Sequence, residues 1–245
     1  MKTLFCQLRI ELMLFLRDKA VATFSLFLPV LTVLFFGYLN RGGKVEDVTY
    51  GSFLVAGGVG MVVSSAAFEN LGVALAQQRE AGILKRLGGT PLRTWTLLTA
   101  KVLTAAVIIM VQTMIMVALN VLLFDADLGG NLLLSIAAMM VGILSFATMG
   151  IALAGLSRNT DMASAAARAI SFPMQFLCGT LFPLSTMPPL LRDIANALPL
   201  TYFVDALRGA MLTGGGLMEY SKSWFILLGC FVVAFVVAVK TFRWE

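Results

Sequence analysis

Two very long apolar runs constrain this chain more than any other feature of its sequence. Residues 50–76 contain one charged side chain, Glu69, and residues 95–124 contain one, Lys101. At about 1.5 Å per residue, a helix made from either run is longer than the roughly 30 Å hydrocarbon core of a lipid bilayer. We therefore predict that both runs are transmembrane helices.

Four further apolar stretches complete the predicted membrane domain. Hydrophobic residues make up 59% of the chain and charged residues 13%, which is about half of the roughly 25% that soluble domains carry. The mean hydropathy is +0.92. We predict an all-α integral membrane protein with six transmembrane helices, forming a single domain over residues 1–245. The predicted spans are residues 20–39, 50–76, 95–124, 131–156, 162–182 and 224–239.

The distribution of basic residues sets the predicted orientation. Thirteen of the 18 Lys and Arg residues fall on one side of the predicted spans and five on the other. Because cytoplasmic loops carry an excess of Lys and Arg, we expect the first side to be the cytoplasm. Both termini then lie inside, and Lys101 snorkels to the inner interface. The expected location is a bacterial or archaeal cell (inner) membrane, crossed several times.

Residues 1–19 are too interrupted by charge to span a membrane. An apolar stripe recurs at helical spacing, and its members are Leu4, Leu8, Leu12 and Phe15. The charged side chains lie largely off that stripe, and they are Lys2, Arg9, Glu11 and Arg17. This pattern predicts an interfacial amphipathic helix at the N-terminus. An ordinary polar tail is the alternative.

Residues 183–212 are apolar but broken by prolines, so they cannot form one spanning helix. The prolines are Pro183, Pro188, Pro189 and Pro199. We expect two short helices, over residues 189–198 and 201–212, with Asp205 and Arg208 paired one turn apart. Non-helical backbone at membrane depth must be satisfied by protein or by a water-filled cavity, which favours a re-entrant helical hairpin on the outer side. A loop lying flat on the membrane surface is the alternative.

Residues 77–92, QQREAGILKRLGGTPL, form an island of charge and glycine between the second and third spans. Its charged residues are Arg79, Glu80, Lys85 and Arg86, Arg93 follows directly after it, and their basic excess predicts a cytoplasmic position. We expect one helix over residues 79–87, ended by Gly88 and Gly89. Its apolar face would be Ile83, Leu84 and Leu87. From these residues alone, the island is equally consistent with a docking site for a soluble partner and with a basic loop that only sets the membrane topology.

Two charges lie within the predicted spans at similar depth. Glu69 is about two turns from the island, and Arg168 is a similar distance into the fifth span from the same side. A single charge at the centre of a bilayer costs roughly 2.5 to 3.5 kcal/mol on insertion scales. We therefore predict that the two form a pair near the inner mouth, or that both line a wet inward cavity. Separate snorkelling to the interface is the alternative.

The residue inventory argues against several other classes of protein. The chain has no histidine, and its three cysteines lie in unrelated apolar settings, at Cys6, Cys178 and Cys230. Ser-His and Cys-His catalytic arrangements and His-based metal sites are therefore excluded, which disfavours a stand-alone membrane enzyme. The net charge of +5 is explained by the side of the membrane on which the basic residues lie, so no nucleic acid is expected as a partner.

Three segments carry a resemblance to a known family. They are FLRDK at the end of the N-terminal helix, QREAGILKRLGGTPL after the second span, and CGTLFPLSTMPPLLRDIANALPLTYFVDALRG between the fifth and sixth spans. In this order the chain resembles the ABC-2 permeases of ATP-binding-cassette exporters, and it is most similar to the compact drug-resistance type.

The resemblance implies partners for the chain. It implies pairing with a second copy of this chain or a homologous permease, and with a separate ABC ATPase subunit that binds ATP and Mg. No cofactor is expected on this chain, which is not an enzyme by itself. A coupling helix in the island would dock into the ATPase, through Arg79, Glu80, Gly82, Ile83, Leu84, Lys85, Arg86 and Leu87. The outer hairpin would cap the exit path, with Pro183, Pro188, Pro189, Pro199, Tyr202, Asp205 and Arg208.

The expected function is export driven by the ATPase partner. The candidate pathway is rich in Phe, Met, Leu and Val, which suits a hydrophobic or amphipathic small molecule, drug-like or lipid-like, leaving the cytoplasm or the inner leaflet. An exporter of a glycan or an ion is an alternative within the family. An ATP-independent secondary transporter is a further alternative, which would require polar groups at the bilayer midplane and interrupted helices in two halves.

Overall fold

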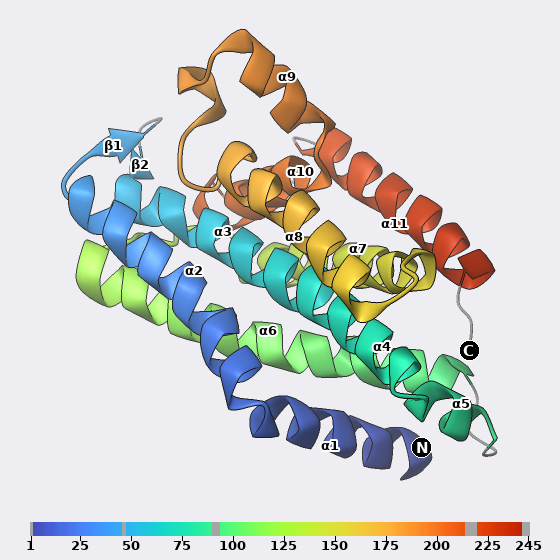
Figure 1. Ribbon diagram of the computed structural model, residues 1–245. Coiled ribbons are helices and arrows are strands. Elements are labelled where there is room, and N and C mark those ends of the chain that lie inside the picture. Colours follow the sequence, from blue (N-terminus) through green and yellow to red (C-terminus); the bar gives the residue numbers. More distant parts are fainter. Residues whose placement is uncertain (1, 46–47, 90–93, 214–219, 242–245) are drawn as a thin grey trace.

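The computed structural model describes residues 2–45, 48–89, 94–213 and 220–241, and its long helices lie side by side in a bundle (Figure 1). The α-helices are α1 (Lys2–Arg17), α2 (Lys19–Leu39), α3 (Tyr50–Val63), α4 (Leu71–Glu80), α5 (Ile83–Gly88), α6 (Thr94–Phe124), α7 (Leu132–Leu156), α8 (Thr160–Leu177), α9 (Pro189–Ala197), α10 (Pro199–Arg208) and α11 (Ser221–Thr241). Shorter elements are the π-helical turns η1 (Ser64–Asn70) and η3 (Gly209–Thr213), the 3-10 turn η2 (Leu184–Thr186) and the antiparallel strands β1 (Lys44–Val45) and β2 (Val48–Thr49). The predicted charge Arg93 lies outside the described residues.

Five of the described helical stretches are long and apolar enough to cross a membrane. They are Lys19–Leu39, Tyr50–Glu80, Thr94–Phe124, Leu132–Leu156 and Ser221–Thr241. These stretches match five of the predicted spans, and the chain is an all-α membrane protein. The predicted span 162–182 corresponds to α8, which ends at Leu177 and is not among the five. That α8 crosses the membrane remains a prediction.

Polar side chains begin three of the helices. Asp18 separates α1 from α2, and its carboxylate accepts a hydrogen bond from the Val21 amide at 3.1 Å. Asn131 caps α7, and Asn159 caps α8 by accepting from the Met162 amide at 2.8 Å. Such caps satisfy amides that have no partner within the helix. The caps fix where α2, α7 and α8 begin.

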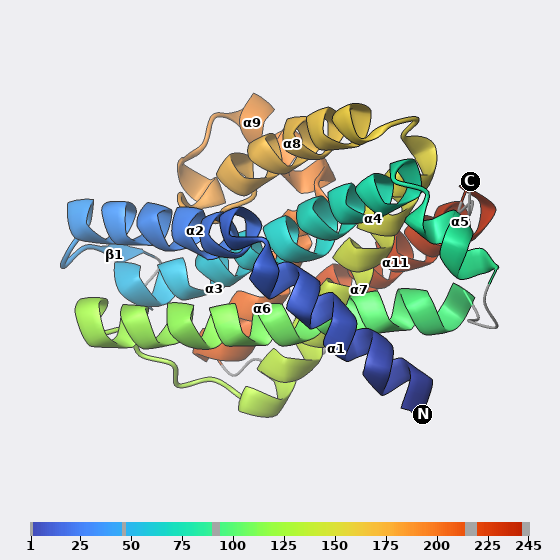
Figure 2. The same cartoon turned by 60° about the horizontal axis from the view of Figure 1, so that its bottom comes forward.

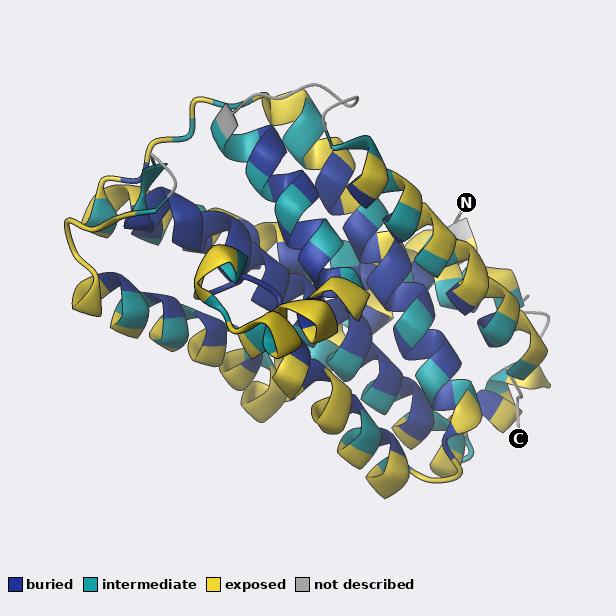
Figure 3. Cartoon of the chain, turned by 90° about the horizontal axis from the view of Figure 1, so that it is seen from above, coloured by how far each residue is buried: buried dark blue, intermediate teal, exposed yellow. Residues whose placement is uncertain are grey.

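The stretch from Tyr50 to Glu80 is the centre of the bundle. It contacts α2, α6, α7, α8 and α10, and every residue of α3 is buried (Figure 3). Small residues permit this packing. A Cβ atom at Gly57 would lie 1.9 Å from the Thr180 carbonyl oxygen, and one at Gly72 would lie 2.9 Å from the Gly150 carbonyl oxygen. The close approach of these backbones holds α3 and α4 against the segments around them.

Helix α1 lies across α6 rather than apart from the bundle (Figure 2). The predicted apolar stripe is half-buried, but Glu11 is the most buried described residue of α1. The expectation that Glu11 lies off the packed face is therefore wrong. Its carboxylate lies 2.8 Å from Lys101 Nζ on α6, and the two side chains are 10% and 4% exposed. Lys101 is therefore neutralised by Glu11 inside the fold, and its depth relative to the membrane interface remains a prediction.

The proline-broken segment forms the two predicted short helices. Pro189 and Pro199 begin α9 and α10, since proline is tolerated at the first helical position. Helix α9 is largely exposed, whereas α10 is packed among α3, α7 and α11. A loop lying flat on the surface therefore does not describe α10. The position of the pair relative to the membrane, as a re-entrant hairpin, remains a prediction.

Arg208 connects α10 to the centre of the bundle. Its Nη1 lies 3.9 Å from Asp205 Oδ1, as expected from their spacing, and its Nη2 donates to the Gly179 carbonyl at 2.7 Å. The guanidinium also lies 3.9 Å from the centre of the Phe53 ring. Tyr202, on the same helix, donates from its hydroxyl to the Asn196 carbonyl at 2.6 Å. These contacts fasten α10 to α3 and α9.

Helices α1 and α5 and the end of α11 lie at one end of the bundle, and the β-hairpin lies at the other (Figure 1). This arrangement agrees with the predicted topology, in which the N-terminus, the island and the C-terminus share one side. Which of the two sides is the cytoplasm rests on the charge distribution alone.

Candidate functional site

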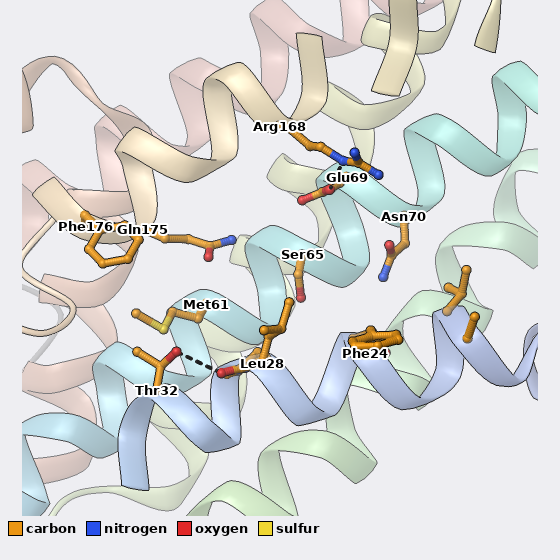
Figure 4. Close-up of a pocket in the computed structure, with 14 residues that line it drawn as sticks. Phe24, Leu28, Thr32, Met61, Ser65, Glu69, Asn70, Arg168, Gln175 and Phe176 are labelled. Carbon is orange, nitrogen blue, oxygen red and sulfur yellow. Dashed lines mark hydrogen bonds and ion pairs between the residues drawn. The ribbon is translucent and has the colours of Figure 1, made fainter. Parts of the chain in front are cut away.

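A cleft with a volume of about 460 Å³ lies between α2, the centre of the bundle and α8 (Figure 4). The labelled side chains that line it come from α2 (Phe24, Leu28 and Thr32), from α3 and η1 (Met61, Ser65, Glu69 and Asn70) and from α8 (Arg168, Gln175 and Phe176). Drug-sized ligands occupy cavities of roughly 300 to 1,000 Å³. The cleft is therefore large enough for a small organic molecule.

The cleft contains the charges that were expected to lie at one depth. Arg168 Nε lies 3.7 Å from Glu69 Oε1. The Arg168 side chain is 76% exposed and the Glu69 side chain 26% exposed, so the pair lies at the mouth of the cleft rather than in a sealed core. The predicted contact between the two charges is present, and both side chains line the cleft. That the cleft is wet and opens toward the cytoplasm remains a prediction.

Uncharged polar groups extend the polar side of the cleft. Ser65, Asn70 and Gln175 line it together with the ion pair. The Asn70 Nδ2 atom is buried and has no hydrogen-bond partner among the described residues. An unsatisfied buried amide costs free energy, so this nitrogen is an unfilled hydrogen-bond donor beside the cleft. Phe24, Leu28 and Phe176 supply an apolar wall, so the cleft is amphipathic.

Glu69 is carried by a π-helical turn that the sequence analysis did not predict. The turn η1 widens the central helix over Ser64–Asn70, and single π-helical turns are frequent at functional sites. Helix α7 approaches it closely, because a Cβ atom at Gly150 would lie 2.7 Å from the Phe68 carbonyl oxygen and 2.8 Å from that of Ala67. The turn is thus held from behind while Glu69 faces the cleft.

The island does not form the single helix expected over residues 79–87. Helix α4 ends at Glu80, Gly82 adopts φ +68°, and α5 begins at Ile83. The left-handed backbone at Gly82 stops the helix, because glycine enters this region without steric cost. Helix α5 then ends at Gly88, as predicted. Residues 90–92 of the island lie outside the described part of the chain.

The apolar face expected for docking is only partly exposed. Leu84 is 1% exposed and packs inward, which corrects its predicted place on a docking face. Ile83 is exposed, as are Lys85 and Arg86, and Leu87 is half-buried. The surface that α5 presents is therefore one apolar side chain beside two basic ones, while Leu84 fastens α5 to the body of the protein.

Arg79 and Glu80 contact the junction between α7 and α8. Arg79 Nη1 donates to the Ala154 carbonyl at 2.8 Å, and its Nη2 donates to the Ser157 carbonyl. Glu80 Oε2 accepts from the Thr160 amide at 2.8 Å. The two charges expected to face an ATPase are therefore engaged within the chain, at the end of α7 and the start of α8.

The buried pair of Glu11 and Lys101 was missed, although the sequence carries a signal for it. Gln7 and Glu11 fall on the same helical face as Leu4 and Leu8, and Gln7 Nε2 donates to Glu11 Oε1 at 3.3 Å. Two polar residues within a packed stripe, together with one lysine in an otherwise uncharged span, favour a buried pair. The pair ties α1 to α6.

The described residues offer no metal site. Within the described ranges, no group of three or more His, Cys, Asp or Glu side chains is placed to hold a metal ion. Cys6, Cys178 and Cys230 are free thiols. The chemistry available in the cleft is thus recognition by charge, amide groups and apolar surface.

Comparison with known proteins gives a family match and several relatives. The family model described as ABC-2 type transporter matches residues 4–212. The chain is 26% identical over 204 residues to the ABC transporter G family member 20 of Dictyostelium discoideum, covering 82% of this chain and 27% of that protein. It is 23% identical over 183 residues to the probable multidrug ABC transporter permease YbhR of Escherichia coli strain K12, covering 74% of this chain and 50% of that protein.

A third relative is similar over a larger share of its own length. The chain is 30% identical over 184 residues to the nodulation protein J of Bradyrhizobium diazoefficiens, covering 71% of this chain and 66% of that protein. The chain therefore spans about a quarter of the Dictyostelium relative and half of the Escherichia coli permease.

Proposed function

This chain belongs to the ABC-2 type transporter family, and on that premise we propose that it is the membrane subunit of an ATP-driven exporter. A separate ABC ATPase subunit would bind ATP and Mg and would supply the energy. The relatives named as permeases are membrane subunits that are not enzymes by themselves, and the same role is proposed here. The second half of the transporter would be another copy of this chain or a homologous permease.

The proposed cargo is a hydrophobic or amphipathic small molecule, drug-like or lipid-like. The observation that carries this proposal is the amphipathic cleft, in which an apolar wall from α2 faces the Glu69 and Arg168 charges and the Asn70 amide. Among the described residues, no group of three or more His, Cys, Asp or Glu side chains is placed to hold a metal ion, so nothing there favours a metal ion as the cargo. The name of one relative, probable multidrug ABC transporter permease, also supports a drug-like cargo.

The proposed docking element for the ATPase is α5. Its exposed side chains Ile83, Lys85 and Arg86 offer one apolar contact beside two basic ones. The element lies at the same end of the bundle as α1 and the end of α11 (Figure 1), and we place this end in the cytoplasm. The segment with α9 and α10 would then cap the exit path on the outer side.

The test is ATP hydrolysis in lipid nanodiscs by this chain purified together with the ATPase that it pulls down. Phe24→Ala and Glu69→Gln alter the cleft, and Phe27→Ala is the matched control, because Phe27 is exposed on α2 outside the lining of the cleft. We expect the two cleft variants to lose stimulation of hydrolysis by amphipathic drugs, and Phe27→Ala to keep it.

Two results would contradict the proposal. If no ATPase co-purifies and export follows a proton or sodium gradient, the chain is a secondary transporter. If Phe24→Ala and Phe27→Ala change drug stimulation equally, the cleft does not hold the cargo.

A further inference from the structure

One dipeptide holds both sides of the junction between α7 and α8. Arg79 donates two hydrogen bonds to carbonyl groups at the end of α7, at Ala154 and Ser157, and Glu80 accepts the Thr160 amide at the start of α8. We call these contacts the junction clasp. Each charge complements the helix end that it meets, because a guanidinium favours the negative end of a helix and a carboxylate the positive end.

The clasp is close to the proposed docking element. Gly82, with its left-handed backbone, separates Glu80 from α5 by a sharp turn. Leu84 is buried, so α5 is packed against the body of the protein and cannot swing freely. A displacement imposed on α5 is therefore passed to the last turn of α4, where the clasp begins.

The clasp and the cleft ion pair join the same two helical segments. Glu69 and Glu80 belong to one continuous helical stretch, and Thr160 and Arg168 both belong to α8. Thr160 and Arg168 are about 12 Å apart along that helix at 1.5 Å per residue. Arg79 and Glu80 are bonded to backbone atoms at 2.8 Å, although Glu80 is itself exposed, whereas Arg168 and Glu69 are 3.7 Å apart and the arginine is largely solvent-exposed. The clasp is thus the stronger connection and the ion pair the weaker one.

We propose that Arg79 and Glu80 are positioning residues of the transporter, and that they couple α5 to α8. When the partner displaces α5, the clasp stays closed and carries the start of α8 along. The distance between Arg168 and Glu69, which are more weakly connected, then changes, and with it the shape of the cleft. This inference rests on the proposed function, since it takes α5 as the ATPase docking element. It replaces the expectation that Arg79 and Glu80 touch the ATPase directly.

The experiment separates association from coupling. Spin labels are attached at Leu31 on α2 and Phe172 on α8, both exposed, in a chain whose three cysteines are replaced. The distance between the labels is measured by double electron-electron resonance in the complex with the co-purified ATPase, without nucleotide and with ATP and orthovanadate. Association is measured by pull-down, and cargo-stimulated ATP hydrolysis is measured in nanodiscs.

Arg79→Met and Glu80→Ala are expected to keep association but to lose the nucleotide-dependent change in distance. Cargo-stimulated hydrolysis should fall about tenfold, a size typical of coupling between two sites. Glu80→Gln is expected to retain the distance change, because its amide oxygen still accepts the Thr160 amide. Arg86→Met, the control on α5, should instead weaken association.

A covalent version of the clasp guards against the case in which these variants fold poorly. In the double variant Glu80→Cys with Thr160→Cys, the two thiols are joined by a bifunctional thiol reagent. The joined protein is expected to keep the distance change between the spin labels and the cargo-stimulated ATP hydrolysis. The inference is overturned if joining abolishes either of them, if Arg79→Met keeps the distance change, or if Arg79→Met loses association in parallel with Arg86→Met. Failure of the unaltered chain to bind any ATPase would overturn the proposed function instead.

Discussion

The buried ion pair between α1 and α6 gives the sharpest stability prediction. The change is Lys101→Met, which removes the cation and keeps most of the aliphatic stem. It leaves the Glu11 carboxylate inside the fold with the Gln7 amide as its remaining partner among the contacts in the structure, at 3.3 Å. Removal of one member of a buried pair leaves an uncompensated charge, which is more damaging than loss of the pair as a whole.

The size of the effect follows from the geometry. Two unit charges 2.8 Å apart attract each other by about 6 kcal/mol at an effective dielectric constant of about 20. Desolvation of two side chains that are 4% and 10% exposed offsets much of this attraction. Breaking such a pair costs about 3 to 5 kcal/mol in measured cases. We therefore expect Lys101→Met to destabilise the docking of α1 by that amount.

Hydrogen exchange of the α1 amides is the suitable assay, because the expected event is local release of this helix. A loss of about 3 kcal/mol corresponds to exchange that is roughly 100-fold faster. Arg9→Met is the matched control, since Arg9 is an exposed charge on the same helix, and it should change the local free energy by less than about 0.5 kcal/mol.

The double variant Glu11→Met with Lys101→Met provides the refutation. An apolar pair of similar volume often replaces a buried ion pair without loss of stability, so the double variant should exchange far more slowly than Lys101→Met alone. If Lys101→Met exchanges like the unaltered protein, or if the double variant is as fast as the single one, the buried pair does not hold α1.

Three further predictions concern single substitutions, each measured by the unfolding free energy in mixed micelles. Gly57→Ala should prevent stable folding, because its Cβ atom would lie 1.9 Å from the Thr180 carbonyl oxygen, while Gly229→Ala, with open space around it, should be neutral. Gly82→Ala meets no atom within 4 Å but has a left-handed backbone, so it should cost about 1 to 2 kcal/mol; no loss would show that the turn relaxes. Arg168→Gln should cost less than about 1 kcal/mol, because its side chain is 76% exposed.

The long helices and the proline-broken segment were predictable because local rules decide them. A long uncharged run has few alternatives to a spanning helix. Pro189 and Pro199 lack an amide hydrogen and can begin a helix but not continue one, so two short helices follow from their positions. The meeting of Glu69 and Arg168 was equally predictable, since a fixed rise per residue converts sequence position into a level along the bundle.

Burial on the short amphipathic segments was not predictable in the same way. Glu11 and Leu84 lie on short helices whose residue pattern does not specify which face packs against the rest of the protein. The neighbouring segments decide which face is buried. Helix α6 supplies a cation that draws Glu11 inward, and the body of the protein covers Leu84. These are tertiary effects, which a pattern of residues in one segment does not contain. Gly82, in contrast, carried a local signal, because glycine commonly ends a helix in the left-handed conformation.

The side of the cleft formed by α2 could not be predicted from the sequence, for a different reason. Phe24, Leu28 and Thr32 of α2 line the cleft, but an apolar residue that faces a cavity has the same composition as one that faces lipid. The space lies between α8 and α2, which packs against the central stretch. The charged side of the site could therefore be found from sequence, and its apolar side could not.

Three sets of charged contacts differ in strength among the helix interfaces of the bundle. The Glu11 and Lys101 pair is short and buried and fixes α1 to α6. Arg79 and Glu80 fix the last turn of α4 to the junction of α7 and α8. The Arg168 and Glu69 pair is longer and exposed. Since the weakest connection yields first, we expect the cleft to open between α8 and η1. A transporter that released α1 instead would need the reverse order of strengths.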